Sequence, residues 1–574
     1  MTAVGATGAG ILERAPRRRL APHRIVGSII MLGLAVFSVW SLLDVDFSWA
    51  RITRGLNTAA GLIAKSDPIS FPSIGDLAYL IGLTLGIVVL GTLLAAVISI
   101  PIAYGAARNT TPAKWVMWIC RGLGVLSRAF PDYVIAVATA MMFVVNSTLP
   151  GVLAFGIHSI GMISKLYADA IEQIDEGPVV AIRAAGGSKA QQFWSGVFPQ
   201  VLPSWIATTL HRADINLRAS VIFAWAGIGG LGLRLKNDLQ DFPESLGAAI
   251  GDGIVIILLC IAFEIVSSTI RRNLLGIRPR GGGTGTTIVR LVTRGRPAPP
   301  RSTSPAAFHP ASPEEALRRP WTAQRVRNLV WILVALVVVA GSFWTAEVFV
   351  YGVNWGQFWP TMASFFPLST GGHPIGDYFE ALLDTLKVAA AATVLAFVLS
   401  LVFGSLAARN VAPNGWVRNA FRVLITIIRG FPEIVVALLL IMVTGLGNQA
   451  GTVALAFGGI GLLGKLIADS FEEVPNGPET ALSAAGATRP QRYFSATLPQ
   501  GMQSLIGNTM YLLDTNFRAS SVLGVVGGAG VGVILFSAAG LQSTHGQITT
   551  LVLMIAGTVL LIEALSQYLR WAFK

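Results

Sequence analysis

Two charged pairs interrupt apolar stretches of the sequence at equivalent positions. Asp214 and Arg218 are four residues apart, and Asp514 and Arg518 repeat them at a constant offset of 300 residues. On a helix, this spacing places both charges on one face. Neutral hydrogen-bond donors accompany the pairs, namely Asn216, Ser220, Asn516 and Ser520. These side chains could line a polar path through a membrane, or each arginine could pair only with its aspartate and position the helix.

Two further arginines occur at equivalent positions. Arg128 and Arg429 each stand two residues before a Phe-Pro pair that is followed by an acidic residue. They could meet an anion near the inner exit of a path, or they could anchor the orientation of the helix that follows. The sequence shows no nucleophile with a base, no paired carboxylates and no metal-ligand cluster. It therefore predicts no catalytic residues and no metal site, and a protein that is not an enzyme.

A second repeated motif is polar and lies between apolar stretches. An Ala-Ala-Gly triplet is followed thirteen residues after its glycine by a proline, in both copies. The residues are Ala184, Ala185, Gly186 and Pro199 in the first copy and Ala484, Ala485, Gly486 and Pro499 in the second. The pattern predicts two short amphipathic helices joined at a glycine turn, with the proline where the chain returns to the membrane. Such a segment would dock a partner, unless it is an ordinary interfacial loop.

Long apolar stretches must carry these motifs. The 574-residue chain is 53% hydrophobic and 12% charged, against about 25% charged in soluble domains, and its mean hydropathy is +0.65. Six stretches in each half approach the length needed to cross a bilayer. They are 25–43, 79–104, 133–147, 150–168, 203–226 and 247–269, then 328–350, 380–406, 433–447, 450–468, 503–526 and 549–567. We expect an all-α integral membrane protein with two tandem six-helix units, related by a pseudo-twofold axis along the membrane normal.

The distribution of arginine predicts the orientation and the domain limits. Arginines cluster between Arg14 and Arg24 and again between Arg271 and Arg296. Because basic residues favour the cytoplasmic side, we expect both termini and the segment between the units to be cytoplasmic. The units are assigned to residues 1–270 and 328–574, joined by an Arg/Gly/Pro-rich linker at 271–327. The net charge of +13 lies mostly in these flanks, which indicates contact with anionic lipid and no binding of nucleic acid.

The repeated polar segment resembles the coupling loop of type I ABC-importer permeases, and phosphonate importer permeases are the most similar group. The resemblance is carried by Ile182–Ser188, by the Pro-Gln turns at 198–200 and 498–500, and by Asn216–Ser220 with its copy Asn516–Ser520. Val180 and Thr480 stand where many such permeases have a glutamate. A salt bridge from that position to an ATPase is therefore not expected here.

The resemblance implies a mechanism as well as a fold. Two copies of a separate ABC ATPase, which holds the ATP and Mg, would dock on the two loops, and an extracytoplasmic binding protein would deliver the substrate. The chain itself would hold no cofactor and would lie in the bacterial cytoplasmic membrane. The substrate would be a phosphonate, or a related oxyanion such as phosphate or phosphite. The alternative is an ion-coupled secondary transporter built from parallel repeats, which would need an ion or proton relay within the membrane.

Overall fold

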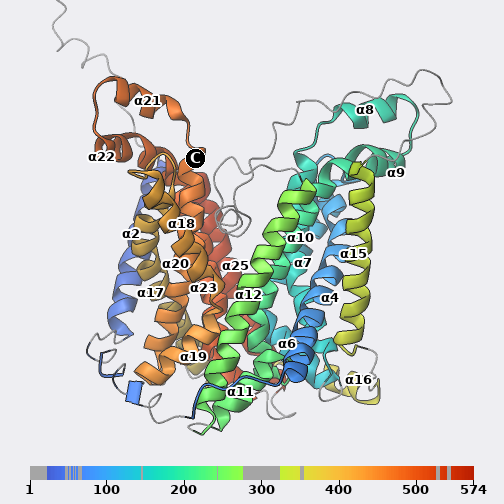
Figure 1. Cartoon of the computed structure of the whole chain (residues 1–574), viewed down its shortest axis with the longest axis vertical. Coiled ribbons are helices and arrows are strands. Elements are labelled where there is room, and N and C mark those ends of the chain that lie inside the picture. Colours follow the sequence, from blue (N-terminus) through green and yellow to red (C-terminus); the bar gives the residue numbers. More distant parts are fainter. Residues whose placement is uncertain are drawn as a thin grey trace, which may run out of the picture.

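The chain folds into two helical halves that lie side by side (Figure 1). The computed structural model describes residues 22–45, 67–143, 147–241, 244–275, 323–348, 355–445, 447–524, 530–538 and 545–573, with a few positions between 50 and 61. All regular elements in these ranges are helical. The ribbons of the two halves diverge toward the end at which α8 and α21 project, and the C-terminus lies at that same end (Figure 1).

The first half comprises residues 22–275. Its elements are α2 (Pro22–Asp44), α4 (Ile74–Ala106), α5 (Lys114–Ala129), α6 (Asp132–Met142), α7 (Leu149–Glu172), α8 (Gly177–Ala184), α9 (Lys189–Gln191), the π-helical segment Gln192–Val197, α10 (Phe198–Ala219), the 3₁₀ segment Ser220–Ala226, α11 (Leu231–Gln240) and α12 (Leu246–Leu275).

The second half comprises residues 323–573 and repeats this order. Its elements are α15 (Ala323–Thr345), α16 (Trp355–Ser364), α17 (Ile375–Ala407), α18 (Gly415–Gly430), α19 (Glu433–Thr444), α20 (Asn448–Glu473), α21 (Asn476–Ala484), α22 (Arg489–Arg492), the π-helical segment Tyr493–Thr497, α23 (Leu498–Leu523), α24 (Val531–Ala538) and α25 (His545–Ala572).

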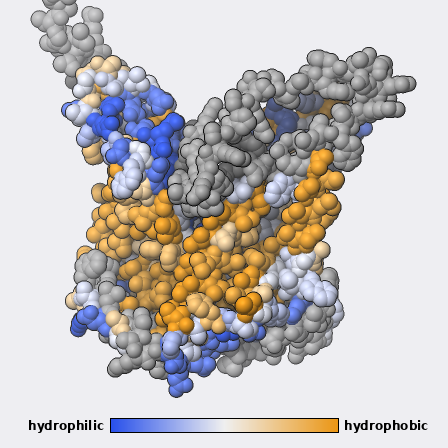
Figure 2. Space-filling view, in the orientation of Figure 1, coloured by the Kyte–Doolittle hydropathy of each residue, from blue (hydrophilic) through white to orange (hydrophobic). Residues whose placement is uncertain are grey.

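On the face seen in Figure 2, an apolar band crosses the bundle and is bordered by hydrophilic surface at both ends. Within the described residues, seven helices are long and apolar enough to cross a membrane, or ten if each bent pair forms one span. The expected six per half would also include α15 and the more polar α23. Leu32 on α2 and Val337 on α15 are 66% and 71% exposed. Such exposure of apolar side chains is stable where lipid replaces water.

The third span of each half differs from the prediction. The stretches 133–147 and 433–447 were expected to cross the membrane alone, but each is the second arm of a bent pair. α5 and α6 meet at 84°, and α18 meets α19 at 77°. The sequence did not reveal α5 and α18 as spans because their apolar residues gather on one face only. As a result, Arg128 lies near the far end of α5, roughly 20 Å along the helix from its start at Lys114.

The fifth helix also begins earlier than expected. A helix was predicted from residue 203, but helical backbone runs from Lys189 through the π-helical segment into α10. Pro199 therefore lies inside a continuous helix. Proline cannot donate the backbone hydrogen bond to the preceding turn, and the π-helical turn before it accommodates that loss. Pro499 follows a π-helical turn in the same way.

The first helix of each half packs against the other half. α2 lies on α17 and α25, whereas α15 lies on α4. At the end of α2, the Lys387 ammonium lies 2.9 Å from the Asp44 carboxylate and over the Trp40 ring. At the end of α15, the Tyr79 hydroxyl donates to Glu347 at 3.0 Å. The two halves therefore interlock, although the limits proposed for the linker remain a prediction.

This interlocking predicts how a divided chain behaves. Residues 1–285 and 310–574, made as separate polypeptides in one cell, should assemble because their mutual surfaces do not depend on the link. Either fragment alone should be unstable, since the surface that receives the other half's first helix stays uncovered. Affinity purification through a tag on one fragment measures this. Recovery of either fragment alone as a stable, monodisperse protein would contradict the interlocked arrangement.

Candidate functional site

The first of two charge clusters joins α10 and α12 of the first half to α18 of the second. Arg218 pairs with Asp214 at 2.6 Å, and its other terminal nitrogen donates to the backbone carbonyl of Arg429 at 2.8 Å. Glu264 on α12 lies between the two guanidinium groups, 3.7 Å from Arg218 and 3.6 Å from Arg429. Two arginines thus face two carboxylates across the boundary between the halves.

A second cluster forms on the opposite side of the boundary with the halves exchanged. Arg518 pairs with Asp514 and donates to the backbone carbonyl of Arg128 at 3.3 Å. Arg128 pairs with Glu563 on α25 at 2.7 Å. The main contacts of the first cluster are thus repeated, although Glu563 forms an ion pair with Arg128 only, whereas Glu264 approaches both arginines of its cluster.

The ion pairs of both clusters match each arginine with a carboxylate. Each holds two arginines and two carboxylates, and the side chain of Asp214 is only 3% exposed. One oxygen of Asp214 and one of Asp514 are buried and accept no hydrogen bond from the described residues. An incoming anion would meet these carboxylates as well as the arginines. The clusters are therefore suited to holding the halves together and to changing partners when the halves move, rather than to binding a free anion.

The neutral donors predicted to line the path make their hydrogen bonds within their own halves, and their path-lining role stays a prediction. Asn216 donates to Thr92 at 2.9 Å, and Asn516 donates to Thr393 at 3.0 Å, both inside their own halves. Ser220 and Ser520 donate to backbone carbonyls of their own halves: those of Leu217 and Thr385. The structure thus brings Arg128, Arg218, Arg429 and Arg518 to the boundary and uses these four residues to tie the fifth helix to its neighbours.

Sequence reasoning missed two members of the clusters. Glu264 and Glu563 sit in apolar stretches of α12 and α25, and their offset is 299 residues instead of 300. A carboxylate within a span was itself a signal, because ionisable residues at membrane depth are rarely placed there without a partner. Nothing in the sequence indicated that the partners were arginines on three other helices.

The two glycine turns have the same geometry at the projecting end of each half. Gly186 and Gly486 are left-handed, with φ of 81° and 79°. Around the first, the amide of Gly187 donates to the Ile182 carbonyl at 2.9 Å and that of Gly186 donates to Arg183 at 3.0 Å. This pair of bonds is a Schellman motif, which ends α8 and turns the chain sharply. Ala487 and Gly486 repeat it after α21.

The helices on either side of each turn are held in register by their own side chains. Ser188 and Gln191 form a reciprocal capping box at the start of α9, and Thr488 and Gln491 form the same box before α22. No residue of α8 or α21 is buried, and Val180 is 51% exposed. The two segments containing Ala184, Ala185, Ala484 and Ala485 thus present a rigid, uncovered surface.

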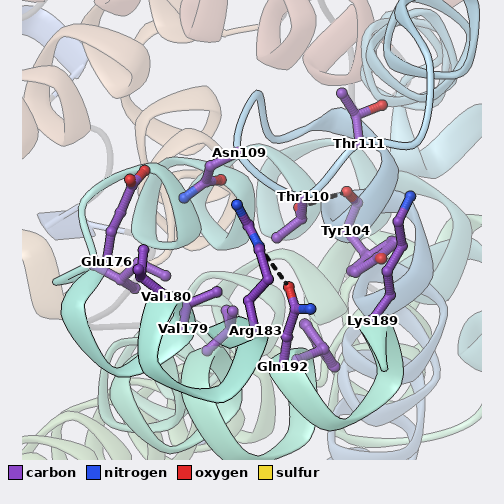
Figure 3. Close-up of a pocket in the computed structure, with 13 residues that line it drawn as sticks. Tyr104, Asn109, Thr110, Thr111, Glu176, Val179, Val180, Arg183, Lys189 and Gln192 are labelled. Carbon is purple, nitrogen blue, oxygen red and sulfur yellow. Dashed lines mark hydrogen bonds between the residues drawn. The ribbon is translucent and has the colours of Figure 1, made fainter. Parts of the chain in front are cut away.

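A cavity of about 240 Å³ lies beneath the first of these segments (Figure 3). Arg183 and Lys189 line it together with Asn109, Thr110 and Tyr104, and Arg183 donates to Gln192 at 3.4 Å. In the second half, Arg489, the counterpart of Lys189, donates to the Pro413 carbonyl, and Arg492, the counterpart of Gln192, donates to Ser483 at 3.4 Å. The cavity separates α8 from the loop after α4 and lies away from the boundary between the halves, so it is not a path through the membrane.

Known proteins share both halves of this architecture. Residues 99–275 and 400–570 each match the family described as the inner membrane component of binding-protein-dependent transport systems. The chain belongs to this family. It is the multi-pass membrane permease of an ABC importer and not an enzyme, and the family implies a partner ATPase and a substrate-binding protein.

Individual relatives match either the whole permease or one half of it. The phosphate-import permease protein of Mycolicibacterium smegmatis is 34% identical over 538 residues, which cover 93% of this chain and 92% of that protein. A phosphite transport system permease protein of Stutzerimonas stutzeri is 36% identical over 248 residues, covering 42% of this chain and 87% of that protein. The fused arrangement therefore occurs in a relative, and single permease units match one half.

A solved structure also matches. The inward-facing MetNI methionine ABC transporter shares 22% sequence identity, with a TM-score of 0.33, over 34% of this chain and 96% of the matched chain.

Proposed function

We propose that this permease imports phosphate or a closely related oxyanion, such as phosphonate or phosphite. The observation that carries the proposal is its identity of 34% along nearly the whole chain with a phosphate-import permease. A phosphite permease that matches one half supports the same class of tetrahedral anion.

The two projecting segments provide the contact with the energy source. We assign one ATPase subunit to each of the α8 and α21 segments, because the two have the same turn, cap and exposed surface. Closure of the ATPase pair on ATP would draw these segments together, and the divergent halves would pivot about the charge clusters. The permease would lie in the bacterial inner membrane, with the segments and both termini in the cytoplasm and a substrate-binding protein outside.

A transport assay tests this proposal against a secondary transporter. The permease is reconstituted in vesicles with its ATPase and binding protein, and uptake of radiolabelled phosphate, phosphite and methylphosphonate is measured. Uptake should require ATP on the side bearing α8 and α21 and should persist when a protonophore or sodium removal abolishes ion gradients. Uptake driven by an imposed gradient without ATP would contradict the proposal.

A further inference from the structure

Arg212 on α10 is a buried arginine without a carboxylate partner. Its residue exposure is 6%. Its Nε donates to the Ser159 hydroxyl at 2.8 Å, and its Nη1 lies 3.7 Å from the Met162 sulfur. Within the described part of the chain, no carboxylate oxygen comes within 4.0 Å of its guanidinium group. A thioether is a weak acceptor, so the N–H groups on the two terminal nitrogens of Arg212 have no strong acceptor among the described residues.

The surroundings of Arg212 place it beside the boundary between the halves. One turn along α10, Asn216 also donates to Ser159, at 3.2 Å. Asp132, Arg518, Tyr511 and His158 are ionisable groups within electrostatic reach of the guanidinium group. Tyr511 belongs to α23 of the other half and is 40% exposed. Arg212 therefore lies on the side of α10 that faces the other half.

The second half shows that the fold does not need a cation here. Leu512 occupies the equivalent position at the offset of 300 residues and is 1% exposed. An apolar side chain thus fills this site in one half, while the other half keeps a charge that is costly to bury. The four arginines of the charge clusters differ, because each is matched by a copy and each is neutralised by carboxylates.

We infer that Arg212 binds the oxyanion during its passage, supplying the positive charge that the balanced clusters do not offer. This assignment rests on the proposed function. The transported anion would accept hydrogen bonds from the terminal nitrogens of Arg212, with the weak contact to Met162 displaced and the contact to Ser159 holding the guanidinium plane. A single cation suffices because one anion passes at a time, which explains why the residue is not duplicated.

Arg212→Leu tests the assignment by installing the residue found in the second half. The maximal rate of phosphate uptake should fall about tenfold or more, because a charge-assisted hydrogen-bond pair is lost. The phosphate concentration for half-maximal uptake should change little, since the binding protein captures the anion outside. Without phosphate, the thermal stability of the purified complex should be unchanged or higher, and the stabilisation that inorganic phosphate gives the wild-type complex without binding protein should disappear.

Two further variants separate a binding role from a structural one. Arg212→Lys keeps the charge and should restore part of the uptake rate and of the phosphate-dependent stabilisation. If the pair Asp132→Asn/Arg212→Leu regained full uptake, Arg212 would serve only to balance Asp132, and the assignment would be overturned. Normal uptake by Arg212→Leu would overturn it as well. Failure of the wild-type vesicles to import any oxyanion would instead refute the proposed function, and the site would fall with it.

Discussion

Arg429→Gln should destabilise the assembled permease by about 3–5 kcal/mol, because it leaves two buried carboxylates to share one arginine. Arg429 is 10% exposed, and it faces Glu264 at 3.6 Å and Asp214 at 3.9 Å from the other half. The unpaired charge would therefore act on the boundary between the halves rather than within one of them. Denaturation of the purified permease in mixed micelles, followed by tryptophan fluorescence, measures the change.

Two controls make this prediction specific. The neutral pair Glu264→Gln/Arg429→Gln should recover most of the lost stability, since removing both partners is far less costly than removing one. Arg121→Gln breaks an ion pair with Glu172 whose side chains are 35% and 30% exposed, and it should cost only about 0–1 kcal/mol. Equal effects of Arg429→Gln and Arg121→Gln would show that the clusters do not hold the halves together.

Replacing both turn glycines with valine should uncouple the permease from its ATPase. The φ values of 81° and 79° at Gly186 and Gly486 are strained for any side chain, at about 1–2 kcal/mol per residue or more for a β-branched one. A Cβ at either glycine meets no atom within 4 Å, so the strain comes from the backbone alone. ATP-dependent uptake should fall about tenfold or more as the segments lose their shape, while the membrane bundle stays folded.

Asparagine provides the matched control at the same two positions. It tolerates left-handed backbone better than other residues with a side chain, and the open space around both glycines accommodates it. The variant Gly186→Asn/Gly486→Asn should therefore retain most uptake and ATPase binding. If the valine variant bound the ATPase and imported substrate normally, the geometry of the turns would be unrelated to docking.

The parts of the fold that repeat along the chain were predictable. Duplication identified the Asp214–Arg218 pair with its copy and the two glycine turns, because selection for the same local contact keeps the same residues at a fixed offset. Local pattern also predicted most apolar spans. It did not identify α5 and α18 as parts of spans, because these two helices are amphipathic. Each of them meets the helix that follows at a sharp angle.

Contacts between the halves were beyond the reach of such patterns. Arg429 and Glu264 are distant in sequence and lie on helices whose relative position depends on packing across the boundary. Arg212 was not predicted as a site residue, because the site residues were predicted from their repetition along the chain. Arg212 has no copy in the second half. The repeated residues therefore indicated the ion pairs that join the halves. The proposed anion-binding residue, Arg212, is instead one that the two halves do not share.

The interlocked arrangement means that α2 is synthesised long before the helices on which it packs. α17, on which α2 packs, begins about 330 residues after α2 ends, so at roughly 5–20 residues per second α2 waits on the order of 20–70 s for its partner. Its apolar surface suits this wait, since lipid can cover every face until α17 arrives. The nascent permease must therefore hold its first helix in the membrane without its partner, and a membrane chaperone that shelters unpaired helices should increase the yield of correctly assembled protein.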